Sequence, residues 1–96
     1  MNLHSDEREL IGKWIVVSGA VDGDETCKRI EEIVAYSLDM VSSNDGGWTK
    51  LFVDKNDGRY WELTYPNGEW HGGGPPTLTC VSDSYVRSKY KILRRR

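Results

Sequence analysis

The sequence predicts an α+β fold: a small two-layer domain in which one long amphipathic helix lies across one face of a mainly antiparallel sheet, followed by a short C-terminal helix. Apolar residues recur at three- and four-residue steps from Asp24 to Val41, as in a helix with one buried face. Later segments are short, rich in β-branched and aromatic residues and separated by turn residues, as strands are. With 96 residues, the chain is long enough for one core, and we expect a single domain.

The first half of the chain predicts a strand followed by the long helix. Lys13–Ser18 is apolar and β-branched and is bounded by glycines, which favours a strand. Gly19–Gly23 is expected to turn the chain. The helix is expected over Asp24–Val41, with Asp24 as its N-cap, and the polar and glycine residues 44–47 should end it.

The second half predicts three strands and a helix. Trp48–Asp54 and Arg59–Tyr65 are strand candidates, and the turn 55–58 between them contains Asp-Gly, so the pair should be antiparallel. Thr77–Val81 is expected to be a third, short strand. A final helix is expected over Asp83–Tyr90, capped by Ser82, which gives the order β-α-β-β-β-α.

Alternation along the Arg59–Tyr65 strand assigns its side chains to two faces. Trp61, Leu63 and Tyr65 fall on one side, which we expect to be buried under the long helix. Tyr60 and Glu62 fall on the other side, which should be partly open to solvent, and Thr77 and Thr79 are expected to join them there.

Composition narrows the classes of function. Residues 1–86 carry seven basic and fifteen acidic side chains, a net charge of −8, whereas residues 87–96 are strongly basic. An acidic body suits a basic protein partner better than a phosphate backbone, so we expect no nucleic acid. No membrane span or secretory signal is visible, which predicts a cytoplasmic protein with free thiols at Cys27 and Cys80.

Residues 57–76 concentrate the groups that could carry chemistry. Glu62, Glu69 and His71 could act in acid–base chemistry or hold a metal, but no metal-binding or catalytic spacing accompanies them. The glycines lack a phosphate-loop pattern, and the two prolines that follow remove donors that such a loop would use. A rigid structural loop is therefore expected, formed by Gly72, Gly73, Gly74, Pro75 and Pro76. A small ligand-binding module, a small enzyme using Glu62 and His71, or an adaptor stay open as alternatives.

Several segments carry a resemblance to a known family. They are LIGKW at Leu10–Trp14, ETCKRIE at Glu25–Glu31, DGRYWELTYP at Asp57–Pro66, HGGGPP at His71–Pro76 and LTC at Leu78–Cys80. Together they resemble the bacterial family called immunity protein 27, which is associated with polymorphic toxin systems. The similarity spans residues 10–90, so 1–9 is expected to be a flexible N-terminus and 91–96 a basic tail outside the domain.

The resemblance implies a small cytoplasmic protein that binds and neutralises a cognate toxin domain, with no catalysis and no cofactor. The toxin is expected to be a basic domain such as a nuclease, and the free protein a monomer. No toxin-contact residues come with the resemblance. From the density of charged and aromatic groups, we expect partner binding at Asp57, Tyr60, Glu62, Glu69, Trp70 and His71.

Overall fold

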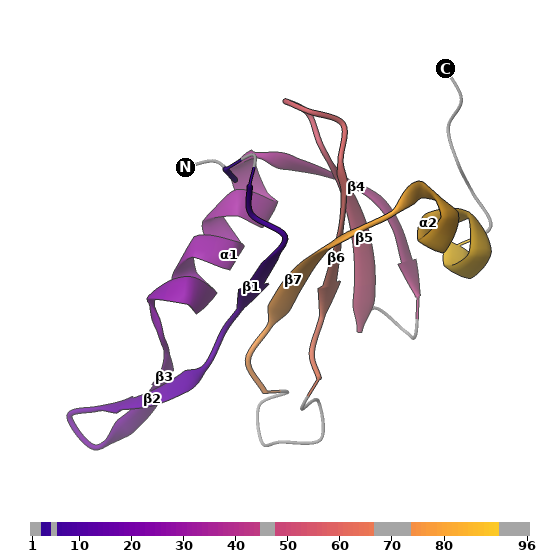
Figure 1. Cartoon of the computed structure of the whole chain (residues 1–96). Coiled ribbons are helices and arrows are strands. Elements are labelled where there is room, and N and C mark those ends of the chain that lie inside the picture. Colours follow the sequence, from indigo (N-terminus) through magenta and orange to yellow (C-terminus); the bar gives the residue numbers. More distant parts are fainter. Residues whose placement is uncertain (1–2, 5, 45–47, 67–73, 91–96) are drawn as a thin grey trace.

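The computed structural model describes residues 3–4, 6–44, 48–66 and 74–90. The order of elements is β1 (Glu9–Ile11), β2 (Trp14–Val17), β3 (Ala20–Gly23), α1 (Glu25–Tyr36), β4 (Leu38–Asn44), β5 (Thr49–Asp54), β6 (Tyr60–Thr64), β7 (Thr77–Val81) and α2 (Asp83–Tyr90). The expected α+β class is confirmed, with a main sheet in the order β1-β7-β6-β5-β4 and a separate β2–β3 hairpin (Figure 1). All strand pairs are antiparallel.

The second half of the chain folds as the sequence predicts. The turn between β5 and β6 closes through an amide–carbonyl hydrogen bond of 2.8 Å from Gly58 to Asp54, and Gly58 has a φ of 78°. A residue with a side chain would be strained at this positive φ, which explains why position 58 is a glycine. Ser82 caps α2, because its hydroxyl oxygen accepts a 3.1 Å hydrogen bond from the amide of Tyr85.

The long helix is shorter than we expected. Asp24 is its N-cap, as predicted, and accepts a 2.9 Å hydrogen bond from the amide of Cys27. The helix ends at Tyr36, however, and the expected continuation to Val41 is wrong, since Leu38–Asn44 forms β4 instead. Leu38 and Val41 lie at helix-like spacings from Ile33, but this segment pairs with β5, and such long-range pairing overrides the local pattern.

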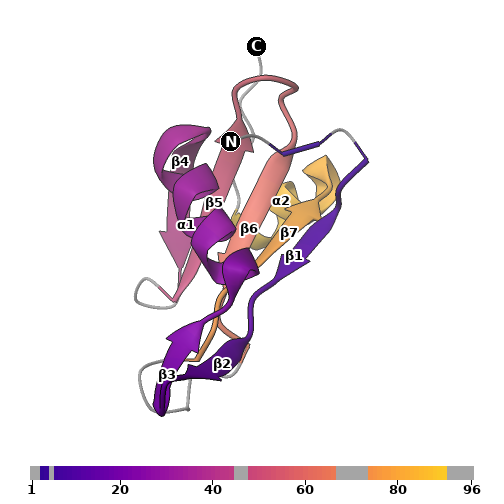
Figure 2. The ribbon, with the colours of Figure 1, turned by 90° about the vertical axis from the view of Figure 1, so that its left-hand side faces the viewer.

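The N-terminal part also differs from the expected single strand. The apolar segment forms β2, but Gly19–Gly23 is not simply a turn, because Ala20–Gly23 returns as β3. The preceding residues Glu9–Ile11 form β1, an edge strand of the main sheet that the sequence did not reveal. Figures 1 and 2 show the β2–β3 hairpin extending beyond the sheet from the N-terminal end of α1.

The two faces of the sheet bury two apolar clusters. The larger lies between α1 and the sheet and contains Leu10, Ile30, Ile33, Leu38, Phe52, Trp61, Leu63 and Leu78. The smaller lies on the opposite face, where Leu51 packs with Val86 and Tyr90 of α2. The predicted burial of Trp61 and Leu63 is therefore confirmed, whereas the expected open face is wrong for Thr77 and Glu62, which are buried.

The N-terminal segment contacts the body of the domain. Arg29 on α1 forms a two-pronged ion pair with Glu7, with both nitrogen–oxygen distances at 2.7 Å. The two parallel N–H···O bonds fix the relative orientation of the guanidinium and the carboxylate, in addition to their charge attraction.

No helix in the described ranges has the length and apolar character that crossing a membrane requires.

Candidate functional site

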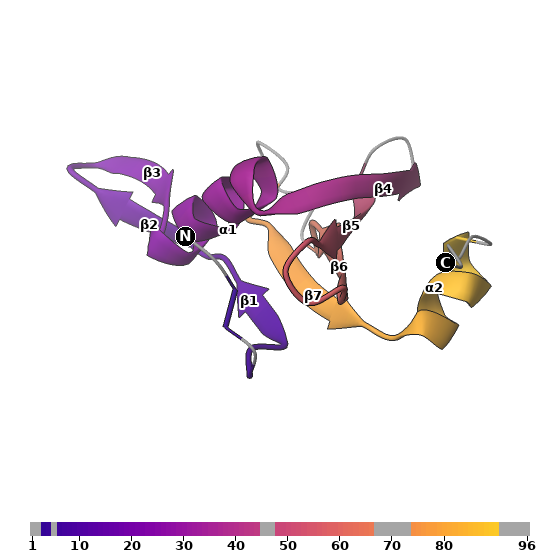
Figure 3. The same ribbon diagram turned by 90° about the horizontal axis from the view of Figure 1, so that it is seen from above.

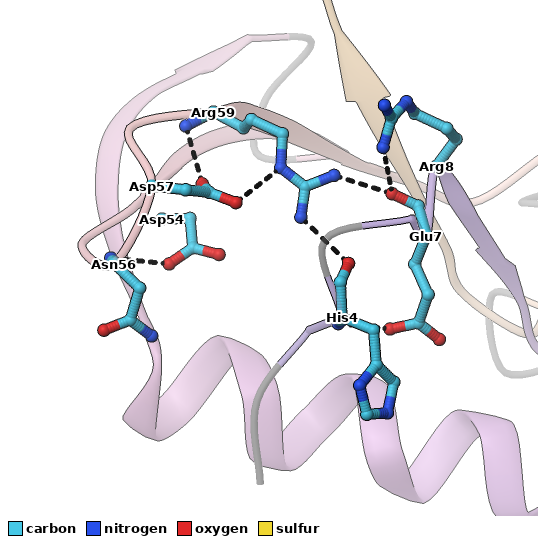
Figure 4. Close-up of polar contacts among 7 residues, drawn as sticks. All are labelled: His4, Glu7, Arg8, Asp54, Asn56, Asp57 and Arg59. Carbon is cyan, nitrogen blue, oxygen red and sulfur yellow. Dashed lines mark hydrogen bonds and ion pairs between the residues drawn. The ribbon is translucent and has the colours of Figure 1, made fainter.

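Asp57, the first of the expected contact residues, lies in the β5–β6 turn and forms hydrogen bonds with Arg59 of the same turn (Figure 4). Its carboxylate accepts hydrogen bonds from the backbone amide of Arg59 at 3.0 Å and from Arg59 Nε at 2.7 Å. The first of these bonds is the main reason why the pKa of Asp57 is lowered. Arg59 also donates to the carbonyl oxygens of Glu7, at 2.7 Å, and His4, at 3.1 Å. This arginine therefore joins the turn to the N-terminal segment.

Glu62 lies beneath α2, with 6% of its surface exposed. Its carboxylate accepts hydrogen bonds from the hydroxyl of Tyr90 at 2.7 Å, from the hydroxyl of Tyr85 at 2.9 Å and from Lys89 Nζ at 2.8 Å. The bond to Glu62 is the main reason why the pKa of Lys89 is raised. Tyr60, its neighbour on the same face, is half-buried and packs against the smaller apolar cluster. This arrangement holds α2 on the sheet.

The Gly-Pro segment is described only from Gly74 onward. The expected contact residues Glu69, Trp70 and His71, and the expected loop residues Gly72 and Gly73, lie outside the described part of the chain. Gly74 has a φ of 73°, a conformation that favours glycine, and both it and Pro75 are buried. The carbonyl oxygen of Pro76 accepts a 2.8 Å hydrogen bond from the amide of Gly12.

The β2–β3 hairpin exposes more apolar surface than its size would suggest. Four aliphatic residues on it are exposed, Ile15 at 41%, Val16 at 73%, Val17 at 50% and Val21 at 66%. Val16 pairs with Val21 on one face of the hairpin, whereas Ile15 and Val17 point to the other face, so both faces carry exposed aliphatic side chains. Apolar surface that a protein leaves exposed often marks a binding site. The hairpin therefore forms a candidate binding element that the sequence analysis did not single out.

The tip and the root of this hairpin are both well defined. Ser18 and Gly19 occupy the two-residue turn with φ values of 52° and 79°, the positive pair that matches the twist of a hairpin. At the root, a Cβ added to Gly12 would lie 2.6 Å from Cys27 Sγ, and one added to Gly23 would lie 2.8 Å from Cys27 Cβ. Both glycines are thus required for the close approach of the hairpin to α1.

A cleft of about 300 Å³ lies at the root of the hairpin, between it and α1. Trp14, Tyr65 and Pro76 supply aromatic and apolar walls, and Asp22 and Glu31 supply carboxylates. Burial is the main reason why the pKa of Tyr65 is raised, and the nearby Glu31 carboxylate adds to the effect.

Lys28 also lines the cleft and forms a long ion pair with Asp22, in which Nζ and Oδ2 are 3.8 Å apart. Both side chains are more than half exposed, so this pair is weak. A more open hollow of about 390 Å³ lies along α1, but only side chains of that helix line it. The cleft at the hairpin root is the better-shaped site for a partner's side chain.

The described residues contain no group of three or more His, Cys, Asp and Glu side chains that could hold a metal ion. Cys27 and Cys80 are free thiols, in agreement with the prediction, and burial raises the pKa of Cys27. The buried thiol fills the space between Gly12 and Gly23.

Among the described residues, the expected contact residues Asp57 and Glu62 lie in different parts of the fold. Asp57 belongs to the β5–β6 turn, and Glu62 on β6 accepts a hydrogen bond from Tyr90 of α2. The β2–β3 hairpin and α2 lie on opposite sides of the main sheet (Figures 1 and 3). Pro76, one of the residues expected to form the structural loop, also lines the cleft. The signal for the hairpin was present in the sequence, because the Ser18-Gly19 dipeptide separates two short segments, and such a pair marks a hairpin turn.

Comparison with known proteins identifies a family. The family model described as Immunity protein 27 matches residues 17–82, which is more than half of the chain. The match begins at the last residue of β2 and ends just before α2. Neither the curated proteins nor the solved structures contain a significant match.

Proposed function

Because the chain belongs to the immunity protein 27 family, we propose that it binds a cognate toxin domain and neutralises it, so that the cell making both proteins survives. The family match over residues 17–82 is the observation that carries this proposal. Membership in an immunity family also suggests a non-enzymatic role. Inhibition then depends on affinity and on what the bound protein covers.

The proposed mechanism combines steric and electrostatic blocking. Residues 1–86 have a net charge of −8, so they attract a basic domain from a distance and increase the rate of association. A nuclease domain fits this requirement, because a surface that binds phosphates is rich in lysine and arginine. Once bound, the immunity protein excludes substrate from the active site or from a surface next to it.

The place of action follows from the same proposal. An immunity protein must meet its toxin in the compartment where the toxin would act, and we place this encounter in the cytoplasm of the producing cell. We also propose that the free protein is a monomer, since residues 1–86 of each copy carry a net charge of −8 and acidic surfaces repel each other, although the basic residues 87–96 bring the whole chain to −2. The residues first expected at the interface stay a prediction: Asp57, Tyr60, Glu62, Glu69, Trp70 and His71.

Co-expression tests the proposed function directly. The toxin domain encoded beside this gene is expressed with and without the immunity protein, and cell survival and co-purification are measured. We expect survival and a stable one-to-one complex. A toxin domain from an unrelated system is the control, and the immunity protein should neither bind it nor protect against it. Death of the co-expressing cells together with absence of a complex would refute the proposal.

Salt dependence tests the electrostatic part separately. Salt screens charges over a Debye length of about 8 Å at physiological ionic strength, so the association rate should fall as sodium chloride is raised. The dissociation rate should change much less, because short-range contacts dominate it. Stopped-flow fluorescence of the tryptophans would measure both rates. An association rate that does not change with salt would refute the electrostatic part of the mechanism and leave only steric blocking.

A further inference from the structure

We propose that the toxin docks on the β2–β3 hairpin and inserts a cationic side chain, arginine or lysine, into the cleft at the hairpin root. This inference rests on the proposed function and assigns the surface that carries it. The surface consists of the exposed aliphatic residues of the hairpin together with the cleft lined by Trp14, Tyr65, Asp22 and Glu31. Val16 and Val21 are cross-strand partners on one face of the hairpin, and Ile15 and Val17 point to the other face, so a partner has to enclose the hairpin to cover all four.

The hairpin contributes little to the main cores. Its aliphatic residues are exposed, and they belong to neither of the two apolar clusters. Both outer edges of this two-stranded sheet lack a strand partner among the residues that the structure describes. A two-stranded hairpin that stands apart from a core is marginally stable in water, so a partner that covers it would add substantial apolar burial.

The root of the hairpin is nevertheless anchored. The amide of Gly12 donates to Pro76 at 2.8 Å, and the amide of Asp24 donates to Lys13 at 2.9 Å. Cys27 lies against both root glycines, and its thiol donates to the Lys13 carbonyl oxygen at 3.5 Å. The Ser18-Gly19 turn fixes the other end. An exposed element that is already ordered loses little entropy on binding, which favours affinity.

The cleft has the chemistry of a cation site. Trp14 and Tyr65 offer aromatic surfaces, on which guanidinium and ammonium groups bind favourably. The Tyr65 ring is itself held by an edge-on contact with Trp48, with ring centres 5.6 Å apart. Glu31 is exposed and lines the cleft, so its carboxylate is accessible to a partner. An arginine fits best, because its guanidinium group can stack on an aromatic ring and form an ion pair with a carboxylate at the same time.

Lys28 reduces the negative charge of the cleft. Its ammonium group lies 3.8 Å from Asp22 and offsets part of the negative charge there. A cationic side chain from the toxin would compete with Lys28 for Asp22 and would be repelled by it. Removing or reversing this charge should therefore strengthen toxin binding, whereas it would weaken the binding of an anionic group.

The charge of the chain favours the toxin over a second copy as the occupant. In a symmetric dimer through the hairpin, the Asp22 and Glu31 carboxylates of both copies would lie at one interface and repel each other. A basic toxin domain instead brings charge complementarity and supplies the cation that the cleft fits. Dimers of the free protein that disappear in a hairpin variant would overturn this choice of occupant.

The first test compares two substitutions that each place a carboxylate at an exposed apolar position. Val16→Asp changes the hairpin, where Val16 is 73% exposed, and Met40→Asp changes the distant strand β4, where Met40 is 60% exposed. The probe is the toxin domain encoded beside this gene, carrying a substitution that abolishes its activity. We expect Val16→Asp to weaken binding by about a hundredfold and Met40→Asp by less than about threefold, as for a central and a remote contact.

The second test uses charge on α1. Glu31→Lys should weaken binding by about tenfold or more, while Glu32→Lys, the same change at a neighbouring residue that does not line the cleft, should have a much smaller effect. Lys28→Glu should strengthen binding by about threefold to tenfold. Unfolding of Lys28→Glu could only weaken binding, so a gain in affinity by this variant cannot be explained by damage to its fold.

The outcomes separate the two proposals. If the unmodified protein neither binds the toxin nor protects the cell, the proposed function fails and the docking surface fails with it. If the unmodified protein binds but Val16→Asp and Glu31→Lys bind like their controls, the function stands and the docking surface is wrong. If Lys28→Glu weakens binding, the side chain in the cleft is not a cation.

Discussion

The hydroxyl of Tyr90 donates a 2.7 Å hydrogen bond to the carboxylate of Glu62 and so joins α2 to the middle strand of the sheet. Tyr85 and Lys89, on the same helix, donate to this carboxylate as well. A buried carboxylate requires such donors, because an unpaired charge away from water is costly. Glu62 is therefore best understood as the anchor of α2, and this role can be separated from toxin binding by experiment.

Replacing Glu62 by alanine should lower the free energy of unfolding by about 2–4 kcal/mol, because the buried Tyr90 hydroxyl loses its acceptor and a charge-assisted network is broken. Urea denaturation measures this loss, and amide hydrogen exchange should show α2 opening before β6. Tyr85→Phe is the control, since it removes one donor from an exposed side chain and should cost less than about 1 kcal/mol. A Glu62→Ala protein as stable as the parent would contradict the anchoring role.

Gly12→Ala should destabilise the root of the hairpin by about 1–3 kcal/mol, the usual cost of overpacking. The new Cβ would lie 2.6 Å from Cys27 Sγ and 2.8 Å from the carbonyl oxygen of Pro76. Adding Cys27→Ala should recover part of the loss, because it removes the sulfur but not the backbone oxygen. Thermal unfolding of the single and double variants gives the coupling between the two positions, and strict additivity would disprove the contact.

Local sequence signals predicted one half of this fold better than the other. The β5–β6 turn, β7 and α2 were predictable because an Asp-Gly turn, alternation and a serine cap each determine local structure. β4 was not, because Leu38 and Val41 keep a helical spacing while their strand depends on pairing with distant β5. The burial of Glu62 was also beyond local reasoning, since it results from the return of α2 over the sheet.

The candidate site shows the same limit. The sequence drew attention to residues 57–76, where aromatic and charged groups are dense, yet the described members of that group serve different parts of the fold. Asp57 binds Arg59 in a turn, whereas Pro76 meets Gly12 at the hairpin root. The exposed aliphatic residues of the hairpin had the composition of a core strand, so only their exposure in three dimensions reveals a surface.

Trp61→Phe should destabilise the core far less than Trp61→Ala. Trp61 is fully buried, and truncation to alanine should cost about 3–5 kcal/mol through lost contacts and a cavity. Its indole nitrogen has no hydrogen-bond partner among the described residues, so phenylalanine retains much of the apolar contact without leaving an acceptor unsatisfied. Urea denaturation of both variants checks this order, and equal losses would show that the indole makes a specific contribution.

Glu7→Gln should remove a component of stability that depends on pH. The bidentate hydrogen bond from Arg29 is the main reason why the pKa of Glu7 falls from 4.5 to about 2. A lowered carboxylate pKa contributes stability that is fully present above the unfolded value and is lost as the pH falls from 4.5 toward about 2. At pH 7 the variant should be about 1–2 kcal/mol less stable than the parent, and the difference should disappear near the lower end of that range. Thermal unfolding followed between these pH values measures it, and Arg29→Leu should abolish the same pH dependence because it removes the guanidinium. A constant difference at every pH would mean that packing, and not the charge pair, links the N-terminal segment to α1.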